Sequence, residues 1–215
     1  MLRGLLILLV ADVFIVAPIA QEALPLLRPV IHSMFLLSGI AIAFRSRAPT
    51  ATVVALLAVV GLVAHWIYHA QPTIALQRAD TALSLGFCVV ITGLLLVQVF
   101  RAGPITLYRI EGAVTAYILI AYSWALAYQL VTLSDPAAFS FSAAALQSQT
   151  LRFRLLYFST TTLTTVSYGD ITPLSPVACS LAALEGVIGQ IFLVLLLARL
   201  VSMELHSRQQ GGHRA

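Results

Sequence analysis

The sequence predicts an all-α membrane protein with six transmembrane helices and a re-entrant segment between the fifth and the sixth. Three observations lead to this prediction. Of the 215 residues, 60% are hydrophobic and only 9% are charged, and the mean hydropathy is +0.97. Apolar stretches that approach the roughly 20 helical residues needed to cross a bilayer recur along the chain. A polar stretch at residues 160–170 lies between the last two of them.

The six candidate spans follow one another from the N-terminus. They lie at about residues 4–20, 25–44, 51–69, 82–100, 108–133 and 176–203. The first resembles a signal peptide at its start, but Asp12 interrupts its apolar core and no small-residue cleavage site follows, so we interpret it as a retained span. The second is the weakest, because Arg28 lies near its start. A turn signal at Asp135 and Pro136 begins the re-entrant region, which covers about residues 134–173.

The placement of the arginines predicts the orientation of these spans. With a cytoplasmic N-terminus, eight arginines fall on the inner side and four on the outer side, as the positive-inside rule requires. The inner set is Arg3, Arg45, Arg47, Arg101, Arg109, Arg199, Arg208 and Arg214, and the outer set is Arg28, Arg78, Arg152 and Arg154. We therefore expect a multi-pass protein of the cell membrane, in a bacterial inner membrane, with both termini cytoplasmic and residues 160–170 on the outer face.

Composition and motifs exclude several classes of function. The net charge of +4 indicates no nucleic-acid partner, because the arginines lie at the ends of the spans and form no single basic face. Cys88 and Cys179 lie in apolar segments and are interpreted as small buried hydrophobic residues. The sequence contains no nucleophile–base set and no metal-ligand cluster that would indicate an enzyme. It also contains no inverted second copy of the re-entrant segment, which would indicate a secondary transporter.

The polar stretch at 160–170 is a poor lipid-facing helix. It holds five threonines within six residues and then Val-Ser-Tyr-Gly-Asp. Irregular backbone at membrane depth persists only where it is buried in protein or lines a water-filled path. A helix-capable stretch, about 152–164, precedes it, and Ser175-Pro176 starts a helix after it with an N-cap hydroxyl and a proline at the first helical position. The sequence therefore predicts the lining of a pore.

Within this stretch, Thr165 to Asp170 resemble the filter signature of tetrameric potassium channels, Thr-Val-Gly-Tyr-Gly-Asp, with Ser167 at the first glycine. The order of four helices, helix, pore loop and helix resembles the six-helix, bacterial-type members of the voltage-gated-like superfamily. The resemblance of the pore covers about residues 105–205, and before them it rests on helix count alone. It implies a four-helix peripheral domain at 1–104, a pore domain at 105–205 and a short cytoplasmic tail at 206–215.

In that family, four filter loops turn their carbonyl oxygens inward and replace the hydration shell of the ion. The resemblance implies that the carbonyls of Val166, Ser167, Tyr168 and Gly169 bind potassium, and that Thr165 adds a hydroxyl at the inner end. It implies a homotetramer in the lipid bilayer that conducts potassium passively, with no organic cofactor and no soluble partner. The alternative is a weakly selective cation channel, because of Ser167.

The first glycine of the family filter takes a left-handed backbone conformation, in which a Cβ atom costs about 1–2 kcal/mol. Ser167 predicts either that the loop keeps this geometry under strain or that its peptide flips and an ion site is lost. We expect the first outcome, because the neighbouring filter residues follow the family pattern.

Residues around the filter are assigned from the same resemblance. Asp170 lies at the outer mouth and is tied to the aromatic residue at the position of Tyr157. Where many relatives carry a glutamate behind the filter, this chain has Thr161, so the carboxylate pair of those relatives is absent. Gly189 stands at the position of the hinge glycine of the inner helix.

The inner-helix segment has one face that we assign to the water-filled cavity. Positions 186, 190, 193 and 197 share this face by the 3.6-residue period, so it carries Gly186, Gln190 and Leu193, with Gln190 as its main polar side chain. Glu185 lies about one position off this face. It either borders the cavity or supports the pore helix.

Three further polar features lie in the first four spans. The fourth span has no charge from residue 83 to residue 100, so it lacks the arginines of a voltage sensor. Asp12 is interpreted as a structural hydrogen-bonding group in preference to a proton- or ligand-sensing site. His65 and His69, with Asp80 across a loop, have a spacing that allows a shared metal ion, but without a clear third ligand we interpret the two histidines as interfacial polar groups.

Overall fold

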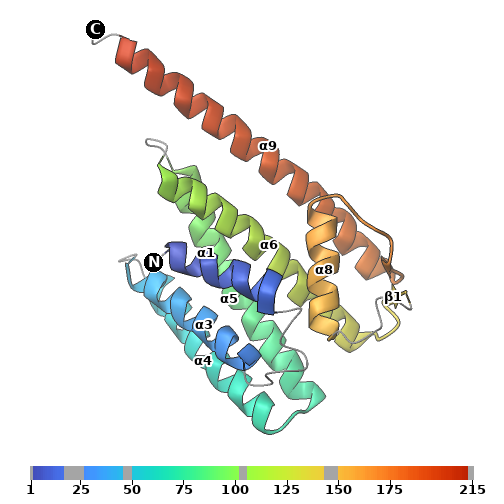
Figure 1. The fold of residues 1–215 in the computed structure, drawn as a ribbon. Coiled ribbons are helices and arrows are strands. Elements are labelled where there is room, and N and C mark those ends of the chain that lie inside the picture. The colour runs from blue at the N-terminus through green and yellow to red at the C-terminus, as the bar shows by residue number, and fades with distance from the viewer. Residues whose placement is uncertain (1, 17–26, 46–49, 102–105, 143–149, 213–215) are drawn as a thin grey trace.

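The computed structural model describes residues 2–16, 27–45, 50–101, 106–142 and 150–212. Figure 1 shows that nearly all of these residues are helical, and the two strands form one short ribbon. The elements in chain order are α1 (Leu2–Ala11), the π-helix η1 (Asp12–Val16), α3 (Leu27–Arg45), α4 (Thr50–Ala70), α5 (Ile74–Phe100), α6 (Leu107–Ser134), β1 (Phe139–Phe141), α8 (Leu151–Leu163), β2 (Ile171–Pro173) and α9 (Pro176–Gly212). The predicted all-α class is confirmed.

Four of the six predicted spans are found as helices long and apolar enough to cross a membrane. They are Thr52–Ala70, Ile74–Phe100, Leu107–Ser134 and Pro176–Arg199. The first two predicted spans extend into residues outside the described ranges. The parts that are described are α1 with η1 and α3, whose apolar section, Pro29–Gly39, is shorter than a span. The chain is thus a multi-pass membrane protein with four candidate spans.

Two helices are longer than the sequence predicts. The helix α5 begins at Ile74 instead of residue 82, because Thr73 caps it and accepts a hydrogen bond from the Leu76 N–H at 3.3 Å. Its polar first two turns therefore extend beyond the apolar stretch. At the other end of the chain, α9 continues to Gly212 and so includes much of the predicted cytoplasmic tail at 206–215.

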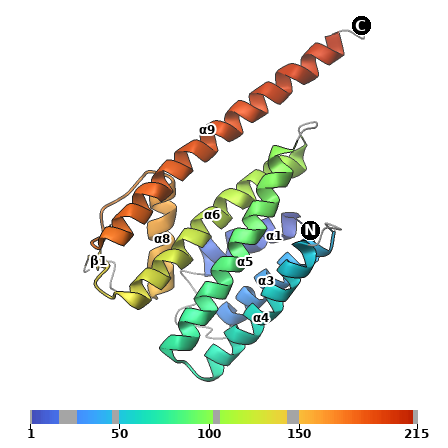
Figure 2. The ribbon, with the colours of Figure 1, turned by 180° about the vertical axis from the view of Figure 1, so that it is seen from behind.

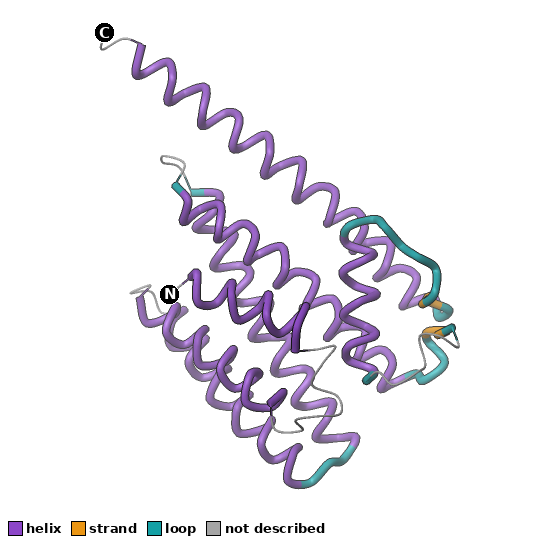
Figure 3. The backbone as a smooth tube through the Cα atoms, viewed as in Figure 1, coloured by secondary structure: helices purple, strands orange, loops and turns teal. Residues whose placement is uncertain are grey.

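The helices form a bundle with one diverging member. Consecutive helices from α3 to α6 pack side by side, α1 packs against α6 and α3, and α8 lies between α6 and α9. Figures 1 and 2 show from opposite sides that the C-terminal half of α9 extends away from the bundle. Figure 3 shows α8 as a short helix at the end of the bundle where the loops and strands around it gather.

The main core joins α1, α3, α4 and α5 to α6. Buried side chains of α1, α3, α4, α5 and α6 contribute, among them Leu5, Phe35 and Phe87. A close approach of α3 to α5 requires a glycine, because a Cβ atom on Gly39 would lie 2.2 Å from the Phe87 ring. This packing fixes the peripheral helices against α6, which in turn carries α8.

A second core lies beside the two strands, one of which precedes α8 while the other follows it. Tyr128, Phe139 and Phe158 pack edge to face, with ring centroids 5.2–5.5 Å apart. β1 pairs with β2 in antiparallel register, with Ser140 opposite Thr172. The segment before α8 is thereby tied to the segment after residue 170, which holds the intervening loop in place.

Candidate functional site

The helix α8, predicted at 152–164 and found at Leu151–Leu163, leads into the polar stretch. Three hydroxyls of the threonine run donate to backbone carbonyls of this helix. The Thr160 hydroxyl donates to the Leu156 carbonyl at 2.8 Å, the Thr161 hydroxyl to the Phe158 carbonyl at 3.0 Å, and the Thr164 hydroxyl to the Thr160 carbonyl at 2.7 Å. These three hydroxyls therefore need no water at membrane depth, because the helix itself supplies their acceptors.

The loop that follows alternates in backbone handedness. Thr165, Ser167 and Gly169 have φ angles of 61°, 41° and 79°, whereas the φ angles of Val166 and Tyr168 are negative. The left-handed φ of Ser167 is the conformation that the resemblance to potassium channels implies for the first glycine of the filter.

The inner end of the loop is anchored to the end of α8. The Thr161 carbonyl accepts hydrogen bonds from the Val166 N–H at 2.9 Å and from the Ser167 N–H at 3.2 Å. The Thr165 N–H donates to the Thr162 carbonyl at 2.9 Å. Three successive loop amides are thus turned back toward the helix, which leaves the loop carbonyls to point elsewhere.

The outer end of the loop is braced by aromatic side chains. The Tyr168 ring stacks on the Tyr157 ring with centroids 6.2 Å apart and planes 6° apart. Tyr157 is also hydrogen-bonded to Asp170, so the predicted contact between these residues is present. Burial, and then the nearby Asp170 carboxylate, raise the pKa of the Tyr157 phenol, so this group keeps its proton and donates it.

A hollow of about 500 Å³ lies between the loop and α9. Its lining includes Thr162, Thr165 and Ser167 from one side and Gly186 and Gln190 from the other. The Gln190 side-chain amide donates to the Thr165 hydroxyl at 3.2 Å. Two members of the predicted cavity face are thus placed next to the filter loop.

Leu193, the other cavity residue predicted from the sequence, is exposed but does not line this hollow. The buried Thr162 hydroxyl has no hydrogen-bond partner within the described part of the chain. In one copy of the chain, the hollow is therefore lined by a paired hydroxyl, that of Thr165, and by an unpaired one, that of Thr162.

Gly189 is a point of close helix contact. A Cβ atom at this position would lie 2.2 Å from the Leu163 carbonyl oxygen and 3.0 Å from the Leu163 carbonyl carbon. The same oxygen accepts a hydrogen bond from the Tyr117 hydroxyl at 3.3 Å. The sequence predicts a hinge here, but the packing of α9 on the last residue of α8 requires glycine whether or not the helix bends.

Glu185 supports the pore helix, which decides between the two roles left open by the sequence. Its side chain is fully buried, and its two carboxylate oxygens accept hydrogen bonds from the Tyr128 and Ser159 hydroxyls, each at 2.5 Å. The Ser159 oxygen also lies 2.7 Å from the Ala121 carbonyl. One carboxylate thus joins α6, α8 and α9 behind the filter loop.

Sequence reasoning missed Tyr128, Ser159 and Tyr117 as supporting residues. A carboxylate in an apolar helix is itself the signal, because such a group must find donors on neighbouring helices. The hydroxyl groups of the nearby pore helix are the first candidates. Nothing in the sequence, however, pairs Glu185 with a tyrosine on the outer helix.

The comparisons with known proteins agree with this geometry. Residues 115–205 match a family model described as ion channel, and this range takes in most of α6, all of α8, the filter loop and most of α9. No curated protein and no solved structure matched the chain. Residues 115–205 are therefore an ion channel domain, and this part of the chain is not an enzyme.

Proposed function

We propose that the chain forms a homotetrameric, passive potassium channel whose filter is built from residues 165–169 of four copies. The observation that carries the proposal is the alternating backbone of Thr165, Ser167 and Gly169 inside an ion channel domain. The bracing of the loop by Tyr157 and Asp170 supports it. Ions cross without chemistry, and the loop carbonyls take the place of the hydration shell.

The side chains that a single copy leaves exposed on the filter loop support assembly into an oligomer. Tyr168 is 70% exposed and Val166 is 52% exposed, and the polar loop around them cannot face lipid. Copies arranged in a closed ring would cover these side chains and enclose a water-filled path. The resemblance of the filter to potassium channels sets the number of copies at four. The C-terminal, negative end of α8 would then favour a cation in the cavity below the filter.

We also propose that α1 with η1 and α3 cross the membrane, which gives six spans with both termini cytoplasmic. The distribution of the arginines supports this orientation. The described helix α5 carries no charged residue from Thr81 to Phe100. We infer that the peripheral helices give the channel little voltage dependence, because they have few charges to move.

Flux and mass measurements test the proposal. In liposomes, a potassium gradient alone should drive cation flux that needs no coupling ion, and native mass spectrometry should give four chains per particle. Gly169→Ala is the control, because its φ of 79° strains any residue with a Cβ atom, so this variant should assemble but conduct little. Monomers under these conditions, or equal flux in Gly169→Ala, would refute the assignment.

Ser167 favours a second candidate, a weakly selective cation channel. Its φ of 41° places a Cβ atom in the left-handed region, at a cost of about 1–2 kcal/mol in each copy. Strain of this kind makes the carbonyl positions less well defined, which would weaken discrimination between potassium and sodium. The two candidates differ in the reversal potential with sodium on one side and potassium on the other.

Ser167→Gly should raise potassium selectivity or single-channel current. Glycine relieves the left-handed strain at no steric cost, and the gain is repeated in every copy of the ring. Reversal potential and unitary current in planar bilayers measure the effect. Parent-like values for both quantities would show that Ser167 is a neutral substitution.

A further inference from the structure

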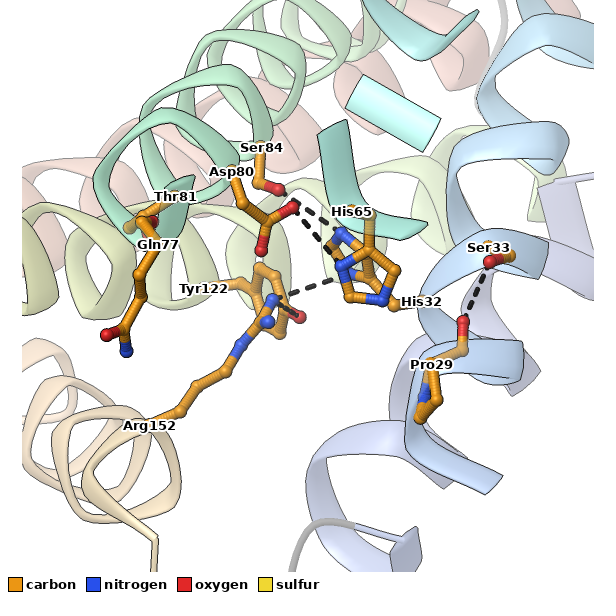
Figure 4. A network of polar contacts seen from close by, with 10 residues as sticks. All are labelled: Pro29, His32, Ser33, His65, Gln77, Asp80, Thr81, Ser84, Tyr122 and Arg152. Carbon is orange, nitrogen blue, oxygen red and sulfur yellow. Dashed lines mark hydrogen bonds and ion pairs between the residues drawn. The ribbon is translucent and has the colours of Figure 1, made fainter. Parts of the chain in front are cut away.

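A cluster of buried polar side chains lies between α3, α4 and α5, and it shares no residue with the filter loop or the hollow beside it. Figure 4 shows His32, His65 and Asp80 converging from these three helices, and each is at most 5% exposed. One ligand atom from each of the three residues lies within 4.8 Å of the other two. The His65 Nδ1 atom is 3.2 Å from Asp80 Oδ1, and the two imidazole rings have centroids 4.5 Å apart.

We propose that His32, His65 and Asp80 form a binding site for a divalent transition-metal ion of the zinc type. Two imidazole nitrogens and one carboxylate oxygen are a donor set that zinc prefers. Metal–ligand bonds of about 2.0–2.1 Å in a tetrahedron set the ligand atoms about 3.3 Å apart, close to the separation of the His65 and Asp80 atoms. His32 thus supplies the third ligand that sequence reasoning lacked.

The protein satisfies His65 only in part. Its Nδ1 atom contacts Asp80, whereas its Nε2 atom is buried and has no hydrogen-bond partner among the residues that the structure describes. The two nitrogens face different sides of the ring, so an ion held by Nδ1 would leave Nε2 as it is. The convergence of three buried ligand atoms is therefore the observation that carries the metal site.

The Asp80 carboxylate supplies a negative charge within the cluster. Asp80 is 5% exposed, and low-dielectric surroundings strengthen the attraction of a carboxylate for a divalent ion. The Arg152 guanidinium opposes this attraction, because it lies 3.4 Å from His32 Nδ1.

Arg152 links the cluster to the pore helix. It lies in the first turn of α8, and its guanidinium donates to the Tyr122 hydroxyl at 2.5 Å and lies 3.4 Å from His32 Nδ1. A guanidinium has no acceptor, so His32 Nδ1 must be the acceptor and its proton is on Nε2, directed at the Ser84 hydroxyl 3.2 Å away.

Metal binding and the contact between Arg152 and His32 therefore exclude each other. An ion on His32 Nε2 requires the proton of the neutral imidazole to move to Nδ1, where it would face the guanidinium N–H. The ion would thus release Arg152 from His32 while the contact with Tyr122 remains. The site is expected to change the packing at the start of α8, which leads to the filter.

Metal binding can be measured without any current. The full, untagged chain in detergent is titrated with Zn²⁺ by calorimetry and with Co²⁺ by visible absorption, which reports tetrahedral coordination. We expect one ion per chain, and at least about tenfold weaker binding in His65→Gln and in Asp80→Asn. His69→Gln is the matched control, because His69 is exposed and lies one turn further along α4, with its ring centroid 4.9 Å from that of His65.

Equal losses in His69→Gln and His65→Gln would overturn the proposal, since they would indicate adventitious binding at a surface histidine. Unchanged binding in His65→Gln would overturn it as well.

Arg152→Gln provides a test that misfolding cannot imitate. Glutamine removes the positive charge and offers an oxygen that can accept the proton of His32 Nδ1. Zinc affinity should therefore rise by about tenfold. Unchanged or weaker binding in this variant would overturn the competition between the ion and Arg152. Because none of these readouts uses ion flux, they remain informative if the chain proves not to conduct potassium.

Discussion

Gly189→Ala should disable the pore, whereas Gly186→Ala should leave it working. The added methyl group at residue 189 would lie 2.2 Å from the Leu163 carbonyl oxygen, and backbone cannot move aside as a flexible side chain can. Either α9 must separate from α8 or the end of α8 must shift, at a cost of about 1–3 kcal/mol in each copy. Because the loop amides donate hydrogen bonds to carbonyls in the last turn of α8, a shift of this turn displaces the filter.

Gly186 is the matched control for this experiment. It lies on the same helix, and nothing comes within 4 Å of a Cβ atom built there. Both substitutions raise helix propensity by about 1 kcal/mol. If residue 189 acts as a hinge, Gly189→Ala should change the open probability of the channel and leave its filter intact. Steric contact instead predicts lost potassium selectivity and a lower thermal stability of the assembly, in Gly189→Ala alone. Normal selectivity with altered open probability in Gly189→Ala would restore the hinge interpretation.

The features that sequence reasoning placed well are local ones. The spans α4, α6 and α9 follow from runs of apolar residues, and α8 with the loop after it follows from a short motif with helices on both sides. Each of these signals is complete within about 30 neighbouring residues. The contact between Tyr157 and Asp170 was also expected, because the resemblance to potassium channels supplied both positions.

The features that it missed depend on contacts between helices far apart in the chain. His32 joins His65 and Asp80 only because α3, α4 and α5 pack side by side, and the helical period predicts a face but not its neighbour. The strands β1 and β2 are three residues each, and their partners are about 30 residues apart. The start of α5 was placed eight residues late, because the polar residues of its first two turns resemble a loop in hydropathy.

The same limit applies to Glu185, where the sequence offered two roles and the structure shows one. A position one step off the cavity face could point toward the cavity or toward the pore helix. The outcome depends on Ser159 and Tyr128, which lie 26 and 57 residues away in the chain. Only the packing of α6, α8 and α9 brings their hydroxyls to the carboxylate.

Glu185→Ala should therefore destabilise the assembled pore, and Glu185→Gln should be close to neutral. Alanine removes the acceptor for two buried hydroxyls, at a cost of about 1–3 kcal/mol for each, and also leaves a cavity. Glutamine keeps one oxygen for Tyr128, and its amide can donate to the Ser159 oxygen. Ser159 then gives its own proton to the Ala121 carbonyl, which lies 2.7 Å away.

Thermal unfolding of the assembly, followed together with potassium flux, distinguishes the two variants. If hydrogen bonding behind the filter is the role of Glu185, the alanine variant should melt at a lower temperature and conduct poorly, while the glutamine variant should resemble the parent. Ser159→Ala adds a check, because it removes one of the two donors and leaves the link between α6 and α9 through Tyr128. Its loss should be smaller than that of Glu185→Ala. An equal loss in Glu185→Gln and Glu185→Ala would show instead that the negative charge itself is required, since the glutamine side chain satisfies both hydroxyls without one.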